Sequence, residues 1–275
     1  MACGVMAGDP FDASEAASRV LKTPDASGKS AAALMVYGDL LTNSDNVNIH
    51  GQYEPPDRPA RPARPSLAAP GQMPRRRLSS EKGRIALLHA VAHIEFNAID
   101  LAFDMAARFT GEIAEAGLDP HQFVSDWFKI GADEARHFNL VSNRLNELAT
   151  KYGDLPAHDG LWESALATND SALARLAIAP IVLEARGLDV TPQMIENLLK
   201  NGDDRSAEVL KVIYHDEIAH VATGVHWFKS LCKVRNLAPI ETFQSLVRDR
   251  FAGGLKPPFN EEARTAAGVP HEFYA

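Results

Sequence analysis

Cysteine is scarce in this sequence: Cys3 and Cys232 are its two cysteines, and no Cys-x-x-Cys pair occurs. This excludes a disulfide framework and is typical of a protein from a reducing compartment. No apolar run approaches the roughly 18 residues that indicate a transmembrane helix. The first ten residues lack the basic start and the apolar core of a signal peptide. We therefore expect a cytoplasmic protein with no membrane partner.

Basic residues are not in excess either. The chain has 28 Lys and Arg against 36 Asp and Glu, which gives a formal net charge of −8. Nothing in the overall charge therefore favours nucleic acid or an anionic membrane as a partner. The hydrophobic content of 45% and the charged content of 23% are ordinary for a soluble globular protein. A chain of 275 residues can bury a full core, in one large domain or two small ones.

One short pattern, Glu-x-x-His, occurs twice, and a lone glutamate precedes each copy. On an α-helix, residues three apart lie on the same face, so the carboxylate and the imidazole of one copy can close on one metal ion. The order Glu, Glu-x-x-His, Glu, Glu-x-x-His is the ligand inventory of a carboxylate-bridged two-metal site in a four-helix bundle. The six candidate ligands are Glu95, Glu134, His137, Glu184, Glu217 and His220.

The surroundings of the pattern strengthen the metal interpretation. All six residues interrupt apolar stripes of helical period, so they are expected to be buried. Four buried carboxylates would repel one another, whereas two divalent cations would neutralise them. A buried Glu–His hydrogen-bond network without metal is the alternative, and a single Glu-x-x-His alone is more often a surface pair.

Neighbouring residues suggest supporting roles. Asp133 and Asp216 each directly precede a candidate ligand, and an acid at this position can reach the outer nitrogen of a ligand histidine on a partner helix. Each is otherwise a solvated acid. Arg136 either pairs with one of these acids or is exposed. Tyr214, one turn before Glu217, is a candidate redox or hydrogen-bonding tyrosine, and otherwise a core residue.

The sequence divides into four parts. Residues 1–52 form a small helical extension, in which 28–38 reads as a loop or a short strand. Residues 53–79 form a Pro- and Arg-rich strap that cannot be helical, because proline recurs too often. Residues 80–235 hold the bundle, and residues 236–275 add a further helix and a tail packed on it.

The predicted fold is all-α. Long helices are expected over 80–109, 120–151, 171–187 and 203–234, with a further helix over 239–251 and a short extra helix from 191. The ligand spacing fits two helical hairpins joined by a long crossover between the second and third helices. Pro180, one turn before Glu184, is expected to kink the helix or open a bulge beside the site.

The strap allows two interpretations. Its arginines include Arg58, Arg61, Arg64 and a run from Arg75 to Arg77. They either form a basic arm for nucleic acid or another anion, or belong to a strap that is pinned to the acidic bundle or to a disordered linker. We favour the second interpretation, because no aromatic residues interleave with the arginines to stack on bases.

With these motifs, the chain resembles the ferritin-like di-iron carboxylate superfamily and, more closely, the bacterial family known as domain of unknown function 455. The resemblance rests on residues 89–100, 133–137, 183–192 and 214–221, on the tail motif 255–260 and on the strap, and it covers about residues 50–265. It implies a ferritin-like bundle and the metal ligands above. It does not bring an established activity.

Mixed carboxylate and imidazole ligation suits iron, or manganese, better than zinc. Glu134 and Glu217 are the simplest bridging ligands. The first functional hypothesis is an O2-dependent hydroxylase or oxidase, in which the two metals carry the redox chemistry and an external donor supplies electrons. Its substrate is a small molecule or a modified biopolymer, and the protein is a monomer or a homodimer. Small residues near the ligands either leave room for the substrate or allow close helix packing; they are Ala98, Ala102, Gly131, Ala177 and Gly224.

Two other hypotheses remain open. The first is non-catalytic metal binding, in the form of iron storage, metal buffering or oxidant scavenging; a chain of this length suits a storage cage poorly. The second is an RNA-modifying hydroxylase that uses the Arg-rich strap, which would show salt-dependent RNA binding.

Overall fold

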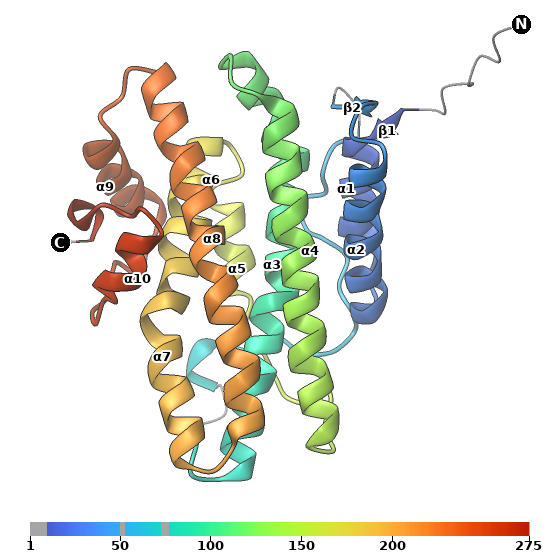
Figure 1. The fold of residues 1–275 in the computed structure, drawn as a ribbon, viewed down its shortest axis with the longest axis vertical. Helices are drawn as coiled ribbons and strands as arrows, with labels where there is room; N and C mark the ends of the chain where they lie inside the picture. The colour runs from blue at the N-terminus through green and yellow to red at the C-terminus, as the bar shows by residue number, and fades with distance from the viewer. Residues whose placement is uncertain (1–9, 50–52, 73–76, 275) are drawn as a thin grey trace, which may run out of the picture.

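The computed structural model describes residues 10–49, 53–72 and 77–274, and within them the predicted all-α fold is confirmed (Figure 1). Strands β1 (Phe11–Asp12) and β2 (Val47–Asn48) form one short parallel pair, with Phe11 opposite Val47. The helices are α1 (Ala13–Lys22), α2 (Ala26–Thr42), η1 (Pro70–Gln72), α3 (Glu81–Glu115), α4 (Pro120–Glu147), α5 (Gly160–Leu166), α6 (Ala172–Ile178), the π-helix η2 (Ala179–Glu184), α7 (Ala185–Lys200), α8 (Asp204–Val234), α9 (Pro239–Arg250), α10 (Glu261–Ala266) and η3 (His271–Phe273).

Two helical hairpins make up the centre of the molecule. Helix α3 packs along α4, and α7 packs along α8, while α4 meets α8 and α3 meets α6 between the hairpins (Figure 1). The connection from α4 to α6 carries α5 and returns along the bundle, so α4 and α7 run in the same direction. These contacts bury one large apolar core and bring the midpoints of the long helices together.

The ends of the long helices follow from local capping. Ser80, Asp119 and Asp203 each accept a hydrogen bond from a backbone N–H in the first turn of α3, α4 and α8. Such a side-chain acceptor satisfies one of the four N–H groups that a helix start leaves unpaired. Pro120 stands in the first turn of α4, where its missing N–H costs nothing. The predicted long helices are therefore present, with α3 extending six residues beyond the expected end at 109.

The expected loop or strand over residues 28–38 is wrong, because this segment lies inside α2. Asp25 caps the helix by accepting from the N–H of Gly28 at 2.6 Å. Lys29, Ala33 and Val36 then recur at helical spacing and are buried on the face that packs against α4. The two glycines at the ends of the segment hid this periodicity.

The short extra helix expected from residue 191 is also wrong, since α7 runs without a break through Pro192 to Lys200. A proline inside a helix leaves the carbonyl four residues earlier without its N–H donor. Here that carbonyl belongs to Leu188, and it accepts a hydrogen bond from Nδ2 of Asn260 at 3.1 Å. The C-terminal segment thus supplies the missing donor and allows the helix to continue.

The C-terminal segment packs on the second hairpin. Helix α9 lies against α6 and α8, and α10 lies against α7 and α8 (Figure 1). Arg264 of α10 forms a buried two-pronged ion pair with Asp189 of α7, at 2.7 and 2.8 Å. Arg250 of α9 pairs with Asp170 at the start of α6. The first pair fixes the tail to α7, the helix that carries Pro192, and the second fixes α9 beside the start of α6.

The strap is pinned to the bundle along its described part. Arg61 pairs with the buried carboxylate of Asp100 at 3.1 Å and lies over the rings of Phe96 and Trp162. Arg58 pairs with Asp159. These contacts match the second interpretation of the strap. Arg75 and Arg76 lie outside the described residues.

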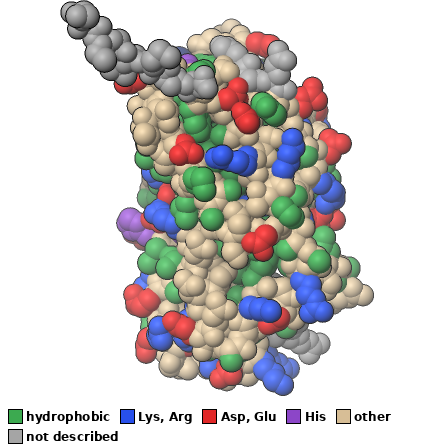
Figure 2. All heavy atoms as spheres, turned by 90° about the vertical axis from the view of Figure 1, so that its right-hand side faces the viewer, with side chains coloured by type: hydrophobic (Ala, Val, Ile, Leu, Met, Phe, Trp, Pro, Cys, Tyr) green, Lys and Arg blue, Asp and Glu red, His purple; other side chains and the backbone are tan. Residues whose placement is uncertain are grey.

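One face of the surface and the most apolar helix show how charged and apolar side chains are distributed. On the face shown in Figure 2, basic and acidic side chains of the described residues are interspersed with scattered apolar ones. Helix α3 has the length and mean hydropathy (1.3) of a membrane span, but 83% of its most apolar window is buried inside the molecule. It is the core helix of the bundle.

Candidate metal centre

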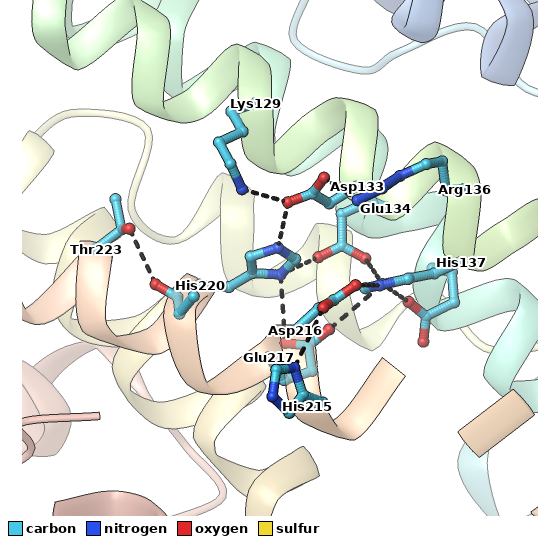
Figure 3. A network of polar contacts seen from close by, with 12 residues as sticks. Lys129, Asp133, Glu134, Arg136, His137, His215, Asp216, Glu217, His220 and Thr223 are labelled. Atoms are coloured by element: carbon cyan, nitrogen blue, oxygen red, sulfur yellow. Dashed lines mark hydrogen bonds and ion pairs between the residues drawn. The ribbon is translucent and has the colours of Figure 1, made fainter. Parts of the chain in front are cut away.

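The six candidate ligands come from four helical segments of the bundle, and Figure 3 shows the two Glu-x-x-His pairs, Glu134 with His137 and Glu217 with His220. Helix α3 contributes Glu95 and η2 ends on Glu184, while α4 and α8 each contribute one Glu-x-x-His pair. The side chains of Glu95, Glu134, His137 and Glu217 lie close enough that one oxygen or nitrogen of each falls within 4.8 Å of all the others.

Both imidazoles turn Nδ1 toward the carboxylates. Nδ1 of His137 lies 3.3 Å from Glu95, 3.5 Å from Oε2 of Glu134 and 3.8 Å from Oε1 of Glu217. Nδ1 of His220 lies 3.0 Å from Oε1 of Glu134 and 3.7 Å from Oε2 of Glu217. Glu134 and Glu217 therefore each present one oxygen to each histidine, which is the placement that a bridging carboxylate requires.

Several oxygen and nitrogen atoms of this cluster have no hydrogen-bond partner of normal geometry within the described residues. All of these atoms are buried: Oε2 of Glu95, both carboxylate oxygens of Glu134, Nδ1 of His137, Oε2 of Glu184, Oε2 of Glu217 and Nδ1 of His220. Buried polar atoms are almost always paired, and leaving one unpaired costs about 1–3 kcal/mol. Seven such atoms, which have no partner of normal hydrogen-bond geometry among the described residues outside the cluster, fit a set of metal ligands.

Glu184 owes its place to the π-helix. Pro180 interrupts the α-helical hydrogen bonds one turn before Glu184, and the helix widens into η2 over Ala179–Glu184. This π-helix is the bulge that the sequence predicted beside the site. Pro180 lies against α8 at Gly224, where an added Cβ would come within 2.4 Å of the proline ring. Short π-helical segments inside α-helices are frequent at functional sites.

The protonation of the metal-free cluster shows how unfavourable its charges are. Burial and the neighbouring carboxylates hold the pKa values of Glu95, Glu184 and Glu217 above their usual range. Although burial opposes it, contacts with Glu134 and Glu95 raise the pKa of His137 to about 11. Without metal, the cluster thus holds extra protons, and bound cations would replace them.

The outer nitrogens of both histidines reach an aspartate on the opposite helix. Nε2 of His137 donates to Asp216 at 3.1 Å, and Nε2 of His220 donates to Asp133 at 3.2 Å (Figure 3). Burial alone would raise the pKa of Asp133, but its hydrogen bonds with His220 and Lys129 lower it to about 2. When a metal ion displaces the extra proton of each imidazolium, these donations would keep the remaining proton on Nε2 and leave Nδ1 to bind the metal.

The structure brings some predicted neighbours to the site and leaves others away from it. Arg136 pairs with Asp133 while keeping about half of its side chain exposed. The hydroxyl of Tyr214 accepts a hydrogen bond from Asn260, so this side chain anchors the C-terminal segment. Gly131 and Gly224 serve close packing, because an added Cβ would lie 2.5 Å from Phe103 at the first and 2.4 Å from Pro180 at the second.

Two histidines outside the motif hold the loop between α4 and α5. Nε2 of His89 accepts backbone N–H groups of Gly153 and Leu155, at 2.9 and 3.3 Å. His93 accepts from the hydroxyl of Tyr152 at 2.9 Å on Nδ1, so its Nε2 donates to the carbonyl of His158 at 3.2 Å. Burial lowers the pKa of both histidines to about 4, and they are neutral.

A cavity of about 490 Å³ opens beside the cluster, and sequence reasoning missed it. Its wall includes the carboxylates of Glu95, Glu134, Glu184 and Glu217, and the rest of the lining is mostly aliphatic. Ile94 also lines it and is 47% exposed. The sequence carries no signal for this cavity, because the exposure of a single isoleucine next to a buried candidate ligand cannot be read from the sequence.

Comparisons with known proteins agree with one another. The family model described as "Protein of unknown function (DUF455)" matches residues 22–275. A Haemophilus influenzae protein described as "Uncharacterized protein" is 42% identical over 208 residues, which cover 75% of this chain and 72% of the relative. No solved structure matches the chain.

Proposed function

We propose that this chain, which belongs to the DUF455 family, is a ferritin-like di-iron protein that uses O2 to hydroxylate or oxidise an organic substrate. The observation that carries the proposal is the convergence of the seven buried, unpaired donor atoms at the wall of an apolar cavity. The first half of that observation supports metal binding, and the second supports access of an organic molecule to the same carboxylates.

The donor set suggests which metal would bind. Each ion would be held by one lone glutamate and one histidine, from the set Glu95, Glu184, His137 and His220. The carboxylates of Glu134 and Glu217 would be shared between the two ions. Four carboxylates and two imidazoles, without thiolate, favour iron, with manganese as the substitute. Four carboxylate charges balance two divalent cations, which removes the repulsion in the metal-free cluster.

When bound, the two irons would activate O2 and accept or deliver the electrons of the oxidation. The residues of this chain would hold the ions at a fixed separation and keep both imidazoles deprotonated at Nδ1 through Asp133 and Asp216. The aliphatic walls of the cavity would exclude bulk water from the reacting carbon. An external electron donor would be required, and a cytoplasmic location fits the need for a reducing compartment.

The lining of the cavity favours this function over the two alternatives. Iron storage or oxidant scavenging needs a path for ions or small oxidants, whereas an apolar cavity lined by metal ligands suits an organic substrate. An RNA substrate has less support, because Arg58 and Arg61 are already paired with Asp159 and Asp100.

Oxygen uptake by the reduced protein tests the proposal. Iron(II) would be added without air, and O2 consumption would be followed in an electrode cell for the wild type and for the double variant Glu134→Ala/Glu217→Ala. We expect rapid uptake by the wild type, with none above the rate of free iron(II) for the variant. Equal uptake by both proteins would contradict the proposal.

A further inference from the structure

The cavity beside the metal cluster is an elongated groove rather than a round pocket. On α3 its lining begins at Ala86 and ends at Leu101, and on the facing side it reaches from Leu183 of η2 to Met194 of α7. Fifteen residues of α-helix span roughly 22 Å, at 1.5 Å per residue. The groove therefore follows the axis of α3 for about four turns, and Glu95 and Ala98 stand within this length.

The groove exists because α3 and α7 diverge. Helix α3 packs against α6, above the π-helix, whereas α7 packs against α8. Gly224 lets Pro180 lie directly against α8, so the chain leaves η2 on the α8 side. After η2, the chain continues as α7, which faces α3 across the groove. Ala90 and Thr191, on the two walls of the groove, are partly exposed.

The walls of the groove are mostly aliphatic, although His158, Ser164, Arg186 and Thr191 also line it, and they offer little to a planar ligand. Leu155, Leu161, Val190, Leu210 and Ile213 supply aliphatic surface, and Phe251 is the sole Phe, Tyr or Trp of the lining within the described residues. The ring nitrogens of His89 and His93 are occupied by the loop between α4 and α5. A base or another flat aromatic ligand would find little to stack on, whereas a flexible hydrocarbon would be enclosed along its length.

We propose that the groove between α3 and α7 binds a long aliphatic chain, of fatty-acyl or similar type, and presents a carbon in the middle of that chain to the metal cluster. The proposal rests on the proposed function for the reaction, but the binding of the chain does not. The length of such a chain matches that of the groove, and its aliphatic surface matches the walls. The carboxylates of the cluster lie between the two ends of the lining.

Gly187 offers a way to block the groove without disturbing the bundle. It lines the groove from the first turn of α7, and a Cβ added to it would meet no other atom within 4 Å. A phenylalanine at this position would therefore enter the groove instead of the core. Gly111 of α3 is the matched control, since it is also helical, is exposed, lies outside the groove lining and has no atom within 4 Å of an added Cβ.

Binding would be measured with cis-parinaric acid, a fluorescent long-chain acid, on the protein as purified. Palmitate and 2-naphthoate would then compete with it, since both are carboxylates but only palmitate has a long chain. We expect palmitate to displace the probe and 2-naphthoate to fail. Gly187→Phe should weaken palmitate binding about tenfold or more, because several methylene groups lose their place in the groove, and Gly111→Phe should leave it unchanged.

Failure of palmitate to bind, or displacement by 2-naphthoate at the same concentration, would overturn the proposal. So would unchanged palmitate binding in a folded Gly187→Phe protein. Ala90→Phe, on the opposite wall, replaces that variant if circular dichroism shows it to be unfolded. Because the assay needs neither iron nor O2, palmitate binding without O2 uptake would contradict the proposed function alone, and O2 uptake without palmitate binding would contradict this inference alone.

Discussion

Nε2 of His137 on α4 donates a hydrogen bond to Asp216 on α8, and Nε2 of His220 on α8 donates to Asp133 on α4. The two helices thus exchange the same contact. Each aspartate directly precedes the glutamate of its own helix's Glu-x-x-His pair and contacts the histidine of the other pair. The exchange fixes both imidazole rings with Nδ1 toward the cluster, so the orientation of each ring depends on the packing of α4 against α8.

Replacing either aspartate is expected to weaken metal binding. In Asp133→Asn or Asp216→Asn, the amide accepts the histidine N–H less strongly and the imidazole becomes a poorer ligand. Metal affinity should fall about 10–100-fold, as measured by competition between the protein and a chelator for cobalt(II). Glu208→Gln, on the exposed face of α8, is the control and should not change the affinity. A change of less than threefold in both aspartate variants would contradict the role assigned to them.

The metal-free protein should lose stability as the pH rises. Glu95, Glu184 and Glu217 have raised pKa values in the folded protein. Their contribution to the free energy of unfolding is therefore complete below the unfolded pKa of 4.5 and is lost as the pH rises toward their folded pKa values. The contributions of His137 and His220 are complete below 6.5 and are lost as the pH rises, for His137 toward about 11. The folded state binds more protons in each case, so stability falls with pH.

This pH dependence would be measured as the urea midpoint at pH values above about 7.5. In that range His89 and His93 are neutral in the folded protein, where their pKa values are about 4, and in the unfolded protein, where the ordinary histidine value is 6.5. Glu184→Gln removes one of the titrating groups and should flatten the curve, and bound metal should do so more strongly. A urea midpoint that rises or stays constant with pH in the metal-free wild type would contradict this account.

The ion pair between Lys29 of α2 and Asp100 of α3 should be important for stability. Both side chains are fully buried, and Lys29 also donates to the carbonyl of Ala60 in the strap. Lys29→Met leaves Asp100 with Arg61 alone and should lower the free energy of unfolding by about 3 kcal/mol. Lys22→Met, at the exposed end of α1, is the control. A loss below about 1 kcal/mol would show that the pair is dispensable.

Gly224→Ala should disturb the π-helix. The new methyl group would lie 2.4 Å from the ring of Pro180, so η2 or α8 must shift, at a cost of about 1–3 kcal/mol. Glu184 ends η2 and should move with it, which would weaken binding of one metal ion. Gly111→Ala adds the same methyl group in open space and should stabilise α3 by up to about 1 kcal/mol. Equal effects of the two substitutions on urea unfolding would contradict this role of Gly224.

The sequence predicted the features that depend on local periodicity and on residue chemistry. The spacing within each Glu-x-x-His pair places its two side chains on one helix face, and the apolar stripes around it require burial. The bulge at Pro180 follows from the missing N–H of proline. These are properties of short segments, so the all-α fold and the convergence of Glu134, His137, Glu217 and His220 could be expected before the structure.

The features that were missed depend on contacts between distant segments. Helix α7 continues past Pro192 because Asn260, far along the chain, pairs with the carbonyl that the proline leaves open. Tyr214 has helical spacing from Glu217, but the same Asn260 draws its hydroxyl to the C-terminal segment. The groove depends on how far α3 and α7 diverge, and the sequence of neither helix contains that distance.

The most direct test of the account is the metal content of the protein, purified without air and loaded with iron(II), together with its Mössbauer spectrum before and after exposure to O2. The account predicts two irons per chain that oxidise together to an exchange-coupled ferric pair, and fewer than two in Glu134→Ala/Glu217→Ala with its helices intact. One zinc per chain, or no iron retained after loading, would contradict the di-iron centre and leave a helical bundle with a buried Glu–His network.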